Sequence, residues 1–165
     1  MTVDPLQELL DKQALYELVV RYCRAVDRAD AELLRSVYHE DAIDEHGAFV
    51  GTRDELVEFL LASTMDVERR PSPLQHAISN ALFEIHGDVA YGETYVEVRR
   101  VEGGARYIEG HGRYVDRFER RDGEWRIAHR TAVAEYVAAE DGRSAYDGAD
   151  FAAGSRDRRD PSYRR

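Results

Sequence analysis

The sequence predicts one α+β domain in which N-terminal helices pack against a strongly curved, largely antiparallel sheet. Two observations predict this class. Apolar residues recur at helical spacing over roughly the first 65 residues, and the period changes to two from about residue 74 onward. The chain has 165 residues, of which 43% are hydrophobic, so it is long enough for one buried core and too short to divide comfortably into two domains.

The first predicted helix begins after Asp4, a suitable N-cap, with Pro5 at the first helical position, where its missing N–H costs nothing. It runs to about Val26. Its apolar stripe consists of Leu15, Leu18, Val19, Tyr22 and Val26. This spacing predicts an amphipathic helix with one face in the core.

Two shorter helices are predicted next. "DRAD" ends the first helix, and Asp30 can cap a second one in "AELLRSVY". Thr52 and Glu55 form a capping box at the start of a third, "GTRDELVEFLLAS". Between these helices, "AIDEHGAFV" predicts one short strand.

The second part of the chain predicts an antiparallel meander. The turn signals "HGD", "EGGA" and "RDGE" separate runs rich in Val, Ile, Tyr and Phe, at residues 74–86, 88–101, 105–120 and 124–137. Such a sheet must curl over the long helix to bury its apolar face, which leaves a cone-shaped cavity between them. We expect a domain over residues 1–138 and a polar tail over 139–165 that is mobile or packs on a neighbouring subunit.

Composition excludes several classes of partner. The formal net charge of −10 argues against nucleic-acid binding. No apolar stretch approaches the roughly 18 residues that span a bilayer, and the N-terminus lacks a signal-peptide layout, so we expect a cytoplasmic protein. Cys23 is the single cysteine, which leaves no disulfide or cysteine zinc cluster. The carboxylates and histidines of "YHEDAIDEHG" fit no compact ligand pattern, so we predict no metal.

Asp27 and His76 are the candidate catalytic pair. A polar side chain inside an apolar cone is costly unless it is paired. Asp27 ends the long helix, and His76 in "PLQHAISN" starts the first long strand. A carboxylate on Nδ1 would fix the histidine tautomer and leave Nε2 free to take a proton. The alternatives are that Asp27 caps the "DRAD" turn and that His76 is a surface residue of an edge strand.

The motifs "RYCRAVDRADAELLRSVYHEDA", "HGAFVG", "LQHAISN" and "GHGRYVDRFERRDGEWRIAHR" resemble the SnoaL-like branch of the nuclear transport factor-like superfamily. Within it, the chain looks most like the group of scytalone dehydratases, bile-acid 7α-dehydratases and hexachlorocyclohexane dehydrochlorinases. The resemblance covers residues 5 to 137. It implies a cystatin-like α+β barrel, a homo-oligomer (trimer or dimer), no metal or organic cofactor, and an Asp–His dyad at Asp27 and His76.

The resemblance also implies further site residues. Tyr22 matches a tyrosine of the bile-acid dehydratases, and His111 looks similar to the second histidine of the scytalone dehydratases. Arg130 or Thr131 could take the place of a polar residue on the last strand that contacts the substrate, and alternation does not tell which of them faces inward. Five residues on a regular helix correspond to about 140° of rotation, so Tyr22 and Asp27 meet one pocket only if the helix unwinds near its end.

The expected function is that of a cofactor-independent lyase, a dehydratase or dehydrohalogenase. His76 would remove a proton, Asp27 would stabilise the imidazolium, and Tyr22 would protonate a departing hydroxyl. A dry cone favours a hydrophobic cyclic substrate. One alternative is a ketosteroid-isomerase-like enzyme with Glu93 or Glu97 as base. Another is a non-catalytic ligand carrier or assembly module.

Overall fold

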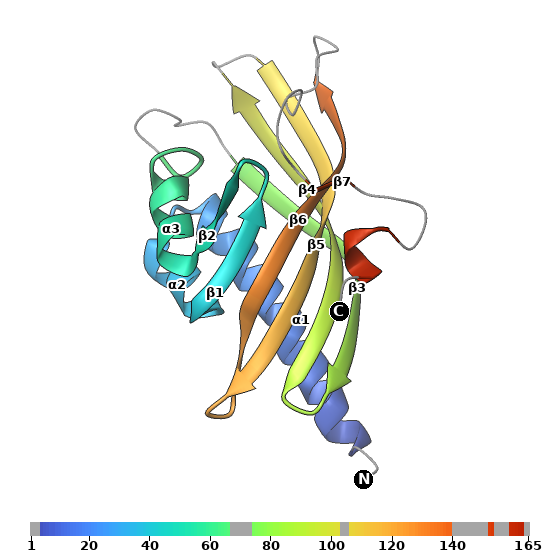
Figure 1. The fold of residues 1–165 in the computed structure, drawn as a ribbon. Helices are drawn as coiled ribbons and strands as arrows, with labels where there is room; N and C mark the ends of the chain where they lie inside the picture. Colours follow the sequence, from blue (N-terminus) through green and yellow to red (C-terminus); the bar gives the residue numbers. More distant parts are fainter. Residues whose placement is uncertain (1–3, 67–73, 103–105, 140–151, 154–158, 164–165) are drawn as a thin grey trace.

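In the computed structural model, which describes residues 4–66, 74–102, 106–139, 152–153 and 159–163, three helices lie against one sheet (Figure 1). The helices are α1 (Pro5–Asp27), α2 (Ala31–Val37) and α3 (Arg53–Leu61). The strands are β1 (Tyr38–His46), β2 (Phe49–Thr52), β3 (Leu74–His86), β4 (Val89–Glu102), β5 (Arg106–Arg121), β6 (Glu124–Ala139) and β7 (Ala152–Ala153), followed by the 3-10 helix η1 (Pro161–Tyr163). The predicted α+β class is confirmed.

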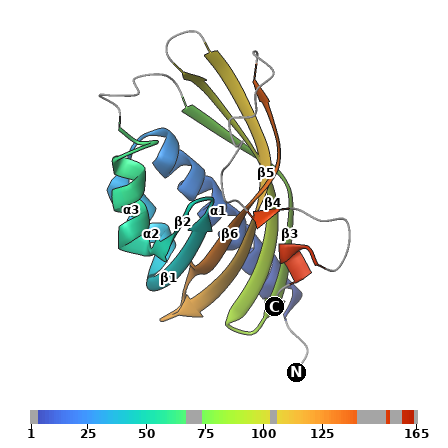
Figure 2. The ribbon, with the colours of Figure 1, turned by 45° about the horizontal axis from the view of Figure 1, so that its top comes forward.

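The strand order is β2-β1-β6-β5-β4-β3, and β7 lies beside β6. β3 to β6 form the predicted antiparallel meander, whereas β1 and β7 run parallel to β6 and make the sheet mixed. The sheet does not close into a barrel, because β2 and β3 remain its edges. α1 runs across one face of the curved sheet, and α2 and α3 lie beside the β1–β2 edge (Figure 1 and Figure 2).

Both predicted aspartate N-caps are present. The Asp4 carboxylate accepts the backbone N–H of Leu6 at 3.1 Å, and the Asp30 carboxylate accepts that of Leu33 at 2.9 Å. Such a cap stabilises a helix by about 1 kcal/mol. Because Asp30 caps α2, the carboxylate of Asp27 is left for another partner.

The segment "AIDEHGAFV" lies in a hairpin, not in the single strand that the sequence predicts. β1 begins at Tyr38, directly after α2, and pairs with β2 across a turn in which Gly47 has φ 67°. The single-strand prediction is therefore wrong, because the positive φ of Gly47 lets the chain reverse between β1 and β2. At the end of β2, the Glu55 carboxylate accepts the backbone N–H of Thr52 at 2.7 Å, as the predicted capping box requires.

α1 supplies the core with the apolar stripe that the sequence predicts. The side chains of this stripe are at most 6% exposed: Leu15, Leu18, Val19, Tyr22, Cys23 and Val26. They pack on apolar side chains of the sheet, including Phe118 and Ile127. Burial of one leucine or valine side chain contributes about 1.5–3 kcal/mol, so this stripe is the main force that holds α1 on the sheet.

β6 contains an extra residue that changes which of its side chains face α1. The register between β5 and β6 shifts at Ala128, which has no opposite residue on β5. A bulge of this kind reverses the alternation of side chains along a strand. As a result, Arg130 faces α1 and lies over the ring of Tyr22, while Thr131 faces the other side of the sheet.

A second register shift in the same strand pair lies between His111 and Gly112. A Cβ atom on Gly112 would lie 2.3 Å from the carbonyl oxygen of Val133. We therefore expect Gly112→Ala to lower the free energy of unfolding by about 2 kcal/mol, because the two strands must move apart. Urea denaturation followed by tryptophan fluorescence measures this loss. Ser79→Ala on the exposed side of β3 is the control, and an equal effect of both substitutions would contradict the prediction.

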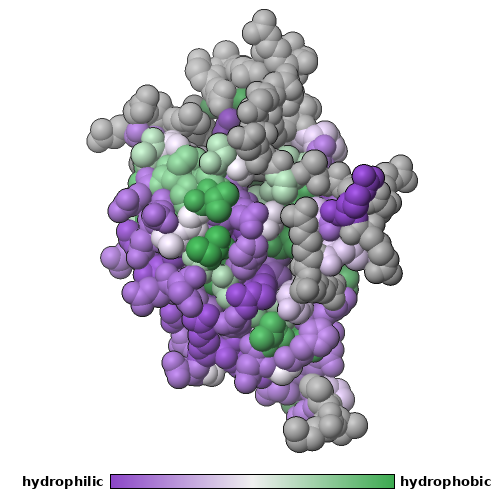
Figure 3. Space-filling view, in the orientation of Figure 1, coloured by the Kyte–Doolittle hydropathy of each residue, from purple (hydrophilic) through white to green (hydrophobic). Residues whose placement is uncertain are grey.

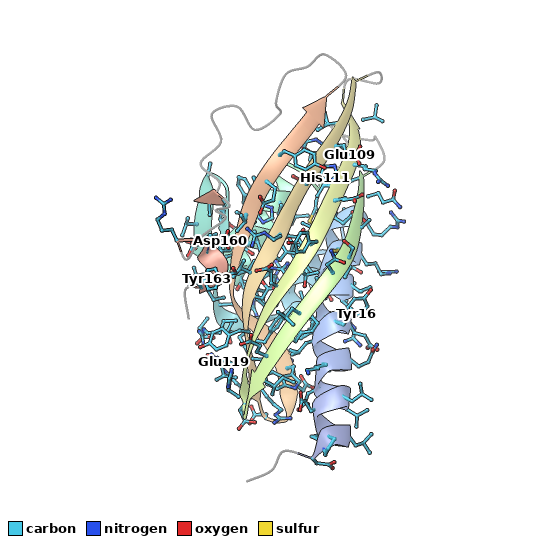
Figure 4. The ribbon with its side chains drawn as sticks, turned by 90° about the vertical axis from the view of Figure 1, so that its right-hand side faces the viewer. Tyr16, Glu109, His111, Glu119, Asp160 and Tyr163 are labelled. Carbon is cyan, nitrogen blue, oxygen red and sulfur yellow. The ribbon has the colours of Figure 1, made fainter. Side chains whose placement is uncertain are left out.

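The described part of the C-terminal tail packs on the face of the sheet away from α1 (Figure 4). Arg113 of β5 donates to both carboxylate oxygens of Asp160, at 3.0 and 2.8 Å, and both residues are buried. Much of the predicted tail, at residues 140–151 and 154–158, lies outside the described residues. The boundary at residue 138, the packing of the tail on a neighbouring subunit and the homo-oligomer remain predictions.

Apolar side chains are exposed around α3 and the β1–β2 hairpin (Figure 3). They are between 36% and 68% exposed: Ile43, Val50, Phe59 and Leu61. Across the described ranges, the helices are too short or too polar to span a bilayer.

Candidate active site

Asp27 and His76 meet where the C-terminal end of α1 lies beside the start of β3. Asp27 is the last residue of α1, and His76 is the third residue of β3. β3 forms an edge of the sheet, so α1 can approach its first residues directly. In this way the fold joins two residues that are 49 positions apart in the sequence.

The contact between the two side chains is short. His76 Nδ1 lies 2.6 Å from Asp27 Oδ1, and the carboxylate also accepts the backbone N–H of His76, at 3.1 Å to Oδ1 and 3.0 Å to Oδ2. An ionised carboxylate can only accept, so Nδ1 carries the hydrogen and Nε2 holds the lone pair. The side chains of His76 and Asp27 are 7% and 12% exposed. The pair is therefore a nearly buried imidazole with its basic nitrogen turned away from the carboxylate.

A cavity of about 230 Å³ opens beside this pair, between α1 and β3. We call it the seam hollow. From β3 it is lined by His76 and Ile78. From α1 it is lined by Val20, Cys23, Arg24, Asp27 and Arg28. The hollow thus has an apolar wall, the dyad, and two arginines.

Large side chains of α1 and the sheet meet where the sequence predicts a cone-shaped cavity. A cavity of about 40 Å³ is lined by residues of the sheet alone, Val96, Val98 and Tyr114 among them. Small-molecule pockets usually measure about 300–1,000 Å³. This cavity is smaller than that range, and a wide cone between the helix and the sheet stays a prediction.

A cluster of large side chains surrounds Arg130 between α1 and the sheet, and we call this cluster the arginine cage. The guanidinium of Arg130 donates to both carboxylate oxygens of Asp116 at 2.7 Å. It lies 4.2 Å from the ring centroid of Tyr22 and 4.0 Å from that of Tyr114. Tyr38 also belongs to the cage and lies further away. Arg130 is fully buried. The ion pair and the cation–π contacts together compensate for the loss of water around its charge.

Burial fixes the protonation of the groups nearest to the dyad. Burial raises the pKa of Tyr22 well above its usual value, and the charge of Asp44 raises it further. Burial likewise raises the pKa of the Cys23 thiol to about 12. For Arg130, burial opposes the charge, but the attraction of Asp116 outweighs it and keeps the pKa above the usual value. Tyr22 and Cys23 are therefore neutral near pH 7, and Cys23 is not a nucleophile.

The structure brings only Asp27 and His76, of the six predicted site residues, to one described cavity. Tyr22 and Arg130 face the interior but lie in the arginine cage. α1 continues without unwinding to Asp27, so the rotation of about 140° keeps Tyr22 out of the seam hollow. Tyr22 could join the dyad only if α1 unwound near its end, and α1 remains helical through Asp27.

His111 and Thr131 lie on the face of the sheet opposite to α1. The ring of His111 stacks on Tyr136 with centroids 4.3 Å apart, and Figure 4 shows it on the upper part of β5. Thr131 lines a separate outer groove of about 520 Å³, together with Tyr163 of η1. Neither side chain reaches the dyad, because the strand alternation and the bulge at Ala128 turn both outward.

The comparison with protein families agrees with this geometry. The family model for the SnoaL-like domain matches residues 7–131. The chain belongs to the SnoaL-like domain family. No curated protein sequence matches it.

Solved structures share the SnoaL-like fold with this chain. A protein of unknown function from Mycobacterium tuberculosis is 27% identical, with a TM-score of 0.70 over 82% of this chain and 79% of that one. A candidate scytalone dehydratase from Novosphingobium aromaticivorans is 19% identical, with a TM-score of 0.72 over 83% and 92%. A hexachlorocyclohexane dehydrochlorinase, LinA-type3, from Novosphingobium barchaimii is 23% identical, with a TM-score of 0.72 over 86% and 97%.

Two residues of the seam hollow in this SnoaL-like protein were not singled out from the sequence. Arg24 and Arg28 line the hollow, four residues apart on α1. At 100° per residue, both lie on the helix face that also carries Val20 and Asp27. This spacing is visible in "VRYCRAVDR". It could have revealed the arginines once Asp27 was taken as the reference position.

A possible metal-ligand group in this SnoaL-like protein lies far from the dyad, on the outer face. Oxygen or nitrogen atoms of Glu97, Glu109 and His111 lie within 4.8 Å of one another. Arg99 already pairs with Glu97 at 2.6 Å and with Glu109 at 3.3 Å. Because the guanidinium neutralises both carboxylates, this arrangement is an ion-pair network and does not resemble an open cation site.

Proposed function

We propose that this SnoaL-like protein is a cofactor-independent lyase that eliminates water or hydrogen halide from a cyclic small molecule. The observation that carries the proposal is the 2.6 Å contact between Asp27 and His76 Nδ1 at the edge of the seam hollow. A histidine held in this way is suited to remove a proton from carbon. The named dehydratase and dehydrochlorinase among the fold relatives support the same reaction class.

The elimination follows from the dyad alone. Nε2 of His76 takes a proton from a carbon atom next to an activating group, and the C–H electrons form the new double bond. Asp27 stabilises the imidazolium that results. The bond to the hydroxyl or halide breaks on the adjacent carbon. A departing hydroxide receives the proton back from the imidazolium, so water leaves and the dyad returns to its starting state. A departing halide leaves as the anion, and the imidazolium then releases its proton to water.

Tyr22 is not needed as the acid in this scheme. It lies in the arginine cage, and its raised pKa makes it a weak proton donor. The imidazolium formed in the first step is a stronger acid and is closer to the leaving group. We therefore assign Tyr22 to the support of Arg130 and α1.

The size of the seam hollow supports a compact substrate. At about 230 Å³, it is smaller than the usual range for drug-sized ligands. Val20 and Ile78 offer apolar surface to a ring. We therefore propose one or two fused rings as the hydrophobic cyclic part of the substrate, and a steroid nucleus fits this hollow less well.

The isomerase alternative lacks support from the positions of its candidate bases. Glu93 pairs with Arg113 at 3.2 Å, and Glu97 pairs with Arg99 at 2.6 Å. Both glutamates belong to the outer face of β4, away from His76. A carrier or assembly module would have the same dyad and hollow but would catalyse no reaction. A measurement of turnover therefore separates it from the lyase.

A panel of small cyclic compounds tests the proposal. The purified protein is incubated with cyclic β-hydroxy ketones, cyclic β-hydroxy acids and halogenated cyclohexanes, and products are followed by mass spectrometry and proton NMR. We expect loss of water or hydrogen halide and a new alkene signal for one class. Migration of a double bond without mass loss would favour the isomerase. Binding of members from each class without any conversion would favour the carrier.

A further inference from the structure

The rim of the seam hollow is positively charged, although the protein as a whole is acidic. Arg24 and Arg28 both line the hollow, and they are one helical turn apart on α1. The full chain has 33 acidic and 23 basic residues. Two guanidinium groups therefore lie beside the candidate dyad in a protein with an excess of acidic residues.

Within the described residues, no carboxylate lies closer than 3.8 Å to either of these arginines. Arg28 Nη1 donates to the backbone carbonyl of Asp27 at 3.2 Å. Arg24 Nη1 lies 3.8 Å from Asp30 Oδ2, at the outer limit for an ion pair, and both side chains are well exposed. In contrast, Arg120 and Arg121 bind carboxylates at 2.8 and 2.7 Å. The contacts described for Arg24 and Arg28 thus leave most of their N–H donors available to a ligand.

We propose that the seam hollow binds an anionic cyclic substrate, a ring that carries a carboxylate. The ring would lie against Val20 and Ile78, and Arg24 and Arg28 would hold the carboxylate at the rim. This inference rests on the proposed lyase function for its chemistry, but the binding can be tested without it. A guanidinium matches a carboxylate with two parallel hydrogen bonds, so the rim fixes orientation as well as charge.

The arrangement assigns a role to each part of the hollow. A carboxylate fixed at the rim prevents the ring from turning freely, which holds one ring carbon near Nε2 of His76. The charged group remains at the exposed end, where its hydration is largely kept. The ring displaces water from the apolar wall. A hydrophobic ring without the acid group would bind in several orientations and would react more slowly.

Matched ligand pairs test the inference. The probes are cyclohexanecarboxylate, cyclohexanecarboxamide and cyclohexyl phosphate, and binding is followed through the NMR signals of the His76 ring. We expect the carboxylate to bind about tenfold more tightly than the amide at low salt, and the difference to shrink as salt is added. Equal affinity for carboxylate and amide would overturn the proposal. Tighter binding of the phosphate would overturn the assignment to a carboxylate.

Substitutions on α1 provide the second arm. The double variant Arg24→Gln/Arg28→Gln should lose the preference for carboxylate over amide. Arg21→Gln is the matched control, because Arg21 lies on the same helix, pairs with Glu17 and does not line the hollow. A preference that survives the double variant would refute the role of the rim.

The result is separable from the fate of the lyase proposal. His76→Ala should keep the carboxylate preference while losing any turnover. If no compound is converted but the preference depends on the rim arginines, the lyase proposal fails and the anion site stands. If compounds are converted without any preference for carboxylate, the lyase proposal stands and the anion site fails.

Discussion

His76→Ala should lower kcat/KM by about a hundredfold to ten-thousandfold for whichever cyclic substrate the protein converts. A positioned general base contributes about 10² to 10⁴ in rate. Apart from Asp27, which is engaged with His76, the described lining of the seam hollow contains no other group able to accept a proton: Cys23 is protonated and the arginines are cationic. Steady-state kinetics with the substrate found in the panel measures the loss.

Asp27→Asn should reduce activity to a similar degree for a different reason. The amide can still accept the backbone N–H of His76, so the end of α1 stays in place. Its side chain can present an N–H to Nδ1, which would move the imidazole hydrogen to Nε2 and remove the base. Asp30→Asn is the matched control. It lies three residues further along and caps α2 without contacting His76, and asparagine is an equally good cap.

These variants give a clear outcome. Circular dichroism and urea denaturation should show that all three proteins are folded. Turnover by His76→Ala within tenfold of the native protein would remove the dyad from the mechanism. Equal losses in Asp27→Asn and Asp30→Asn would mean that the end of α1 acts through structure alone.

Asp116→Asn should cause the largest loss of stability among conservative substitutions in the core. It leaves the charge of Arg130 buried without its carboxylate, and breaking a buried pair in this way costs about 3–5 kcal/mol. This is a large share of the roughly 5–15 kcal/mol by which a domain is stable. Urea denaturation, with the midpoint and slope compared with the native protein, measures the effect.

A double variant separates the charge from the packing. Asp116→Leu/Arg130→Met replaces the pair by apolar side chains and should recover most of the stability lost in Asp116→Asn. Asp41→Asn is the exposed control, because its pair with Arg121 is solvated and should change stability by less than about 1 kcal/mol. If Asp116→Asn is no more harmful than Asp41→Asn, the arginine cage is not held by its ion pair.

The sequence predicts the backbone of this protein better than it predicts the cavities. The periods of 3.6 and 2 locate the helices and the four long strands, and the capping signals at Asp30 and Thr52 locate two helix starts. These features depend on residues that are close together in the sequence. The hairpin at Gly47 is missed because "AIDEHGAFV" is interpreted as one strand, although Asp44 to Gly47 separate its two apolar ends.

The pairing of Asp27 and His76 could be anticipated from the motifs, whereas the shape of the site could not. A cavity depends on how side chains from distant elements fill the space. Tyr22 and Tyr114 enclose Arg130 between α1 and the sheet, and no single segment carries that information. The dyad therefore faces a hollow at the seam between α1 and β3, where the rim is charged.

The extra residue on β6 has a consequence for comparing this chain with its relatives. If Ala128 is aligned without a gap against a strand that lacks the bulge, the positions from His129 to Ala134 are matched to side chains on the wrong surface, and only the second extra residue of β6, Glu135, restores the register. Arg130 would then be read as solvated and Thr131 as internal. The gap at Ala128 must therefore be placed in the alignment before residue roles are transferred along this strand. Mutant libraries that target the interior should choose their positions on β6 from that corrected alignment.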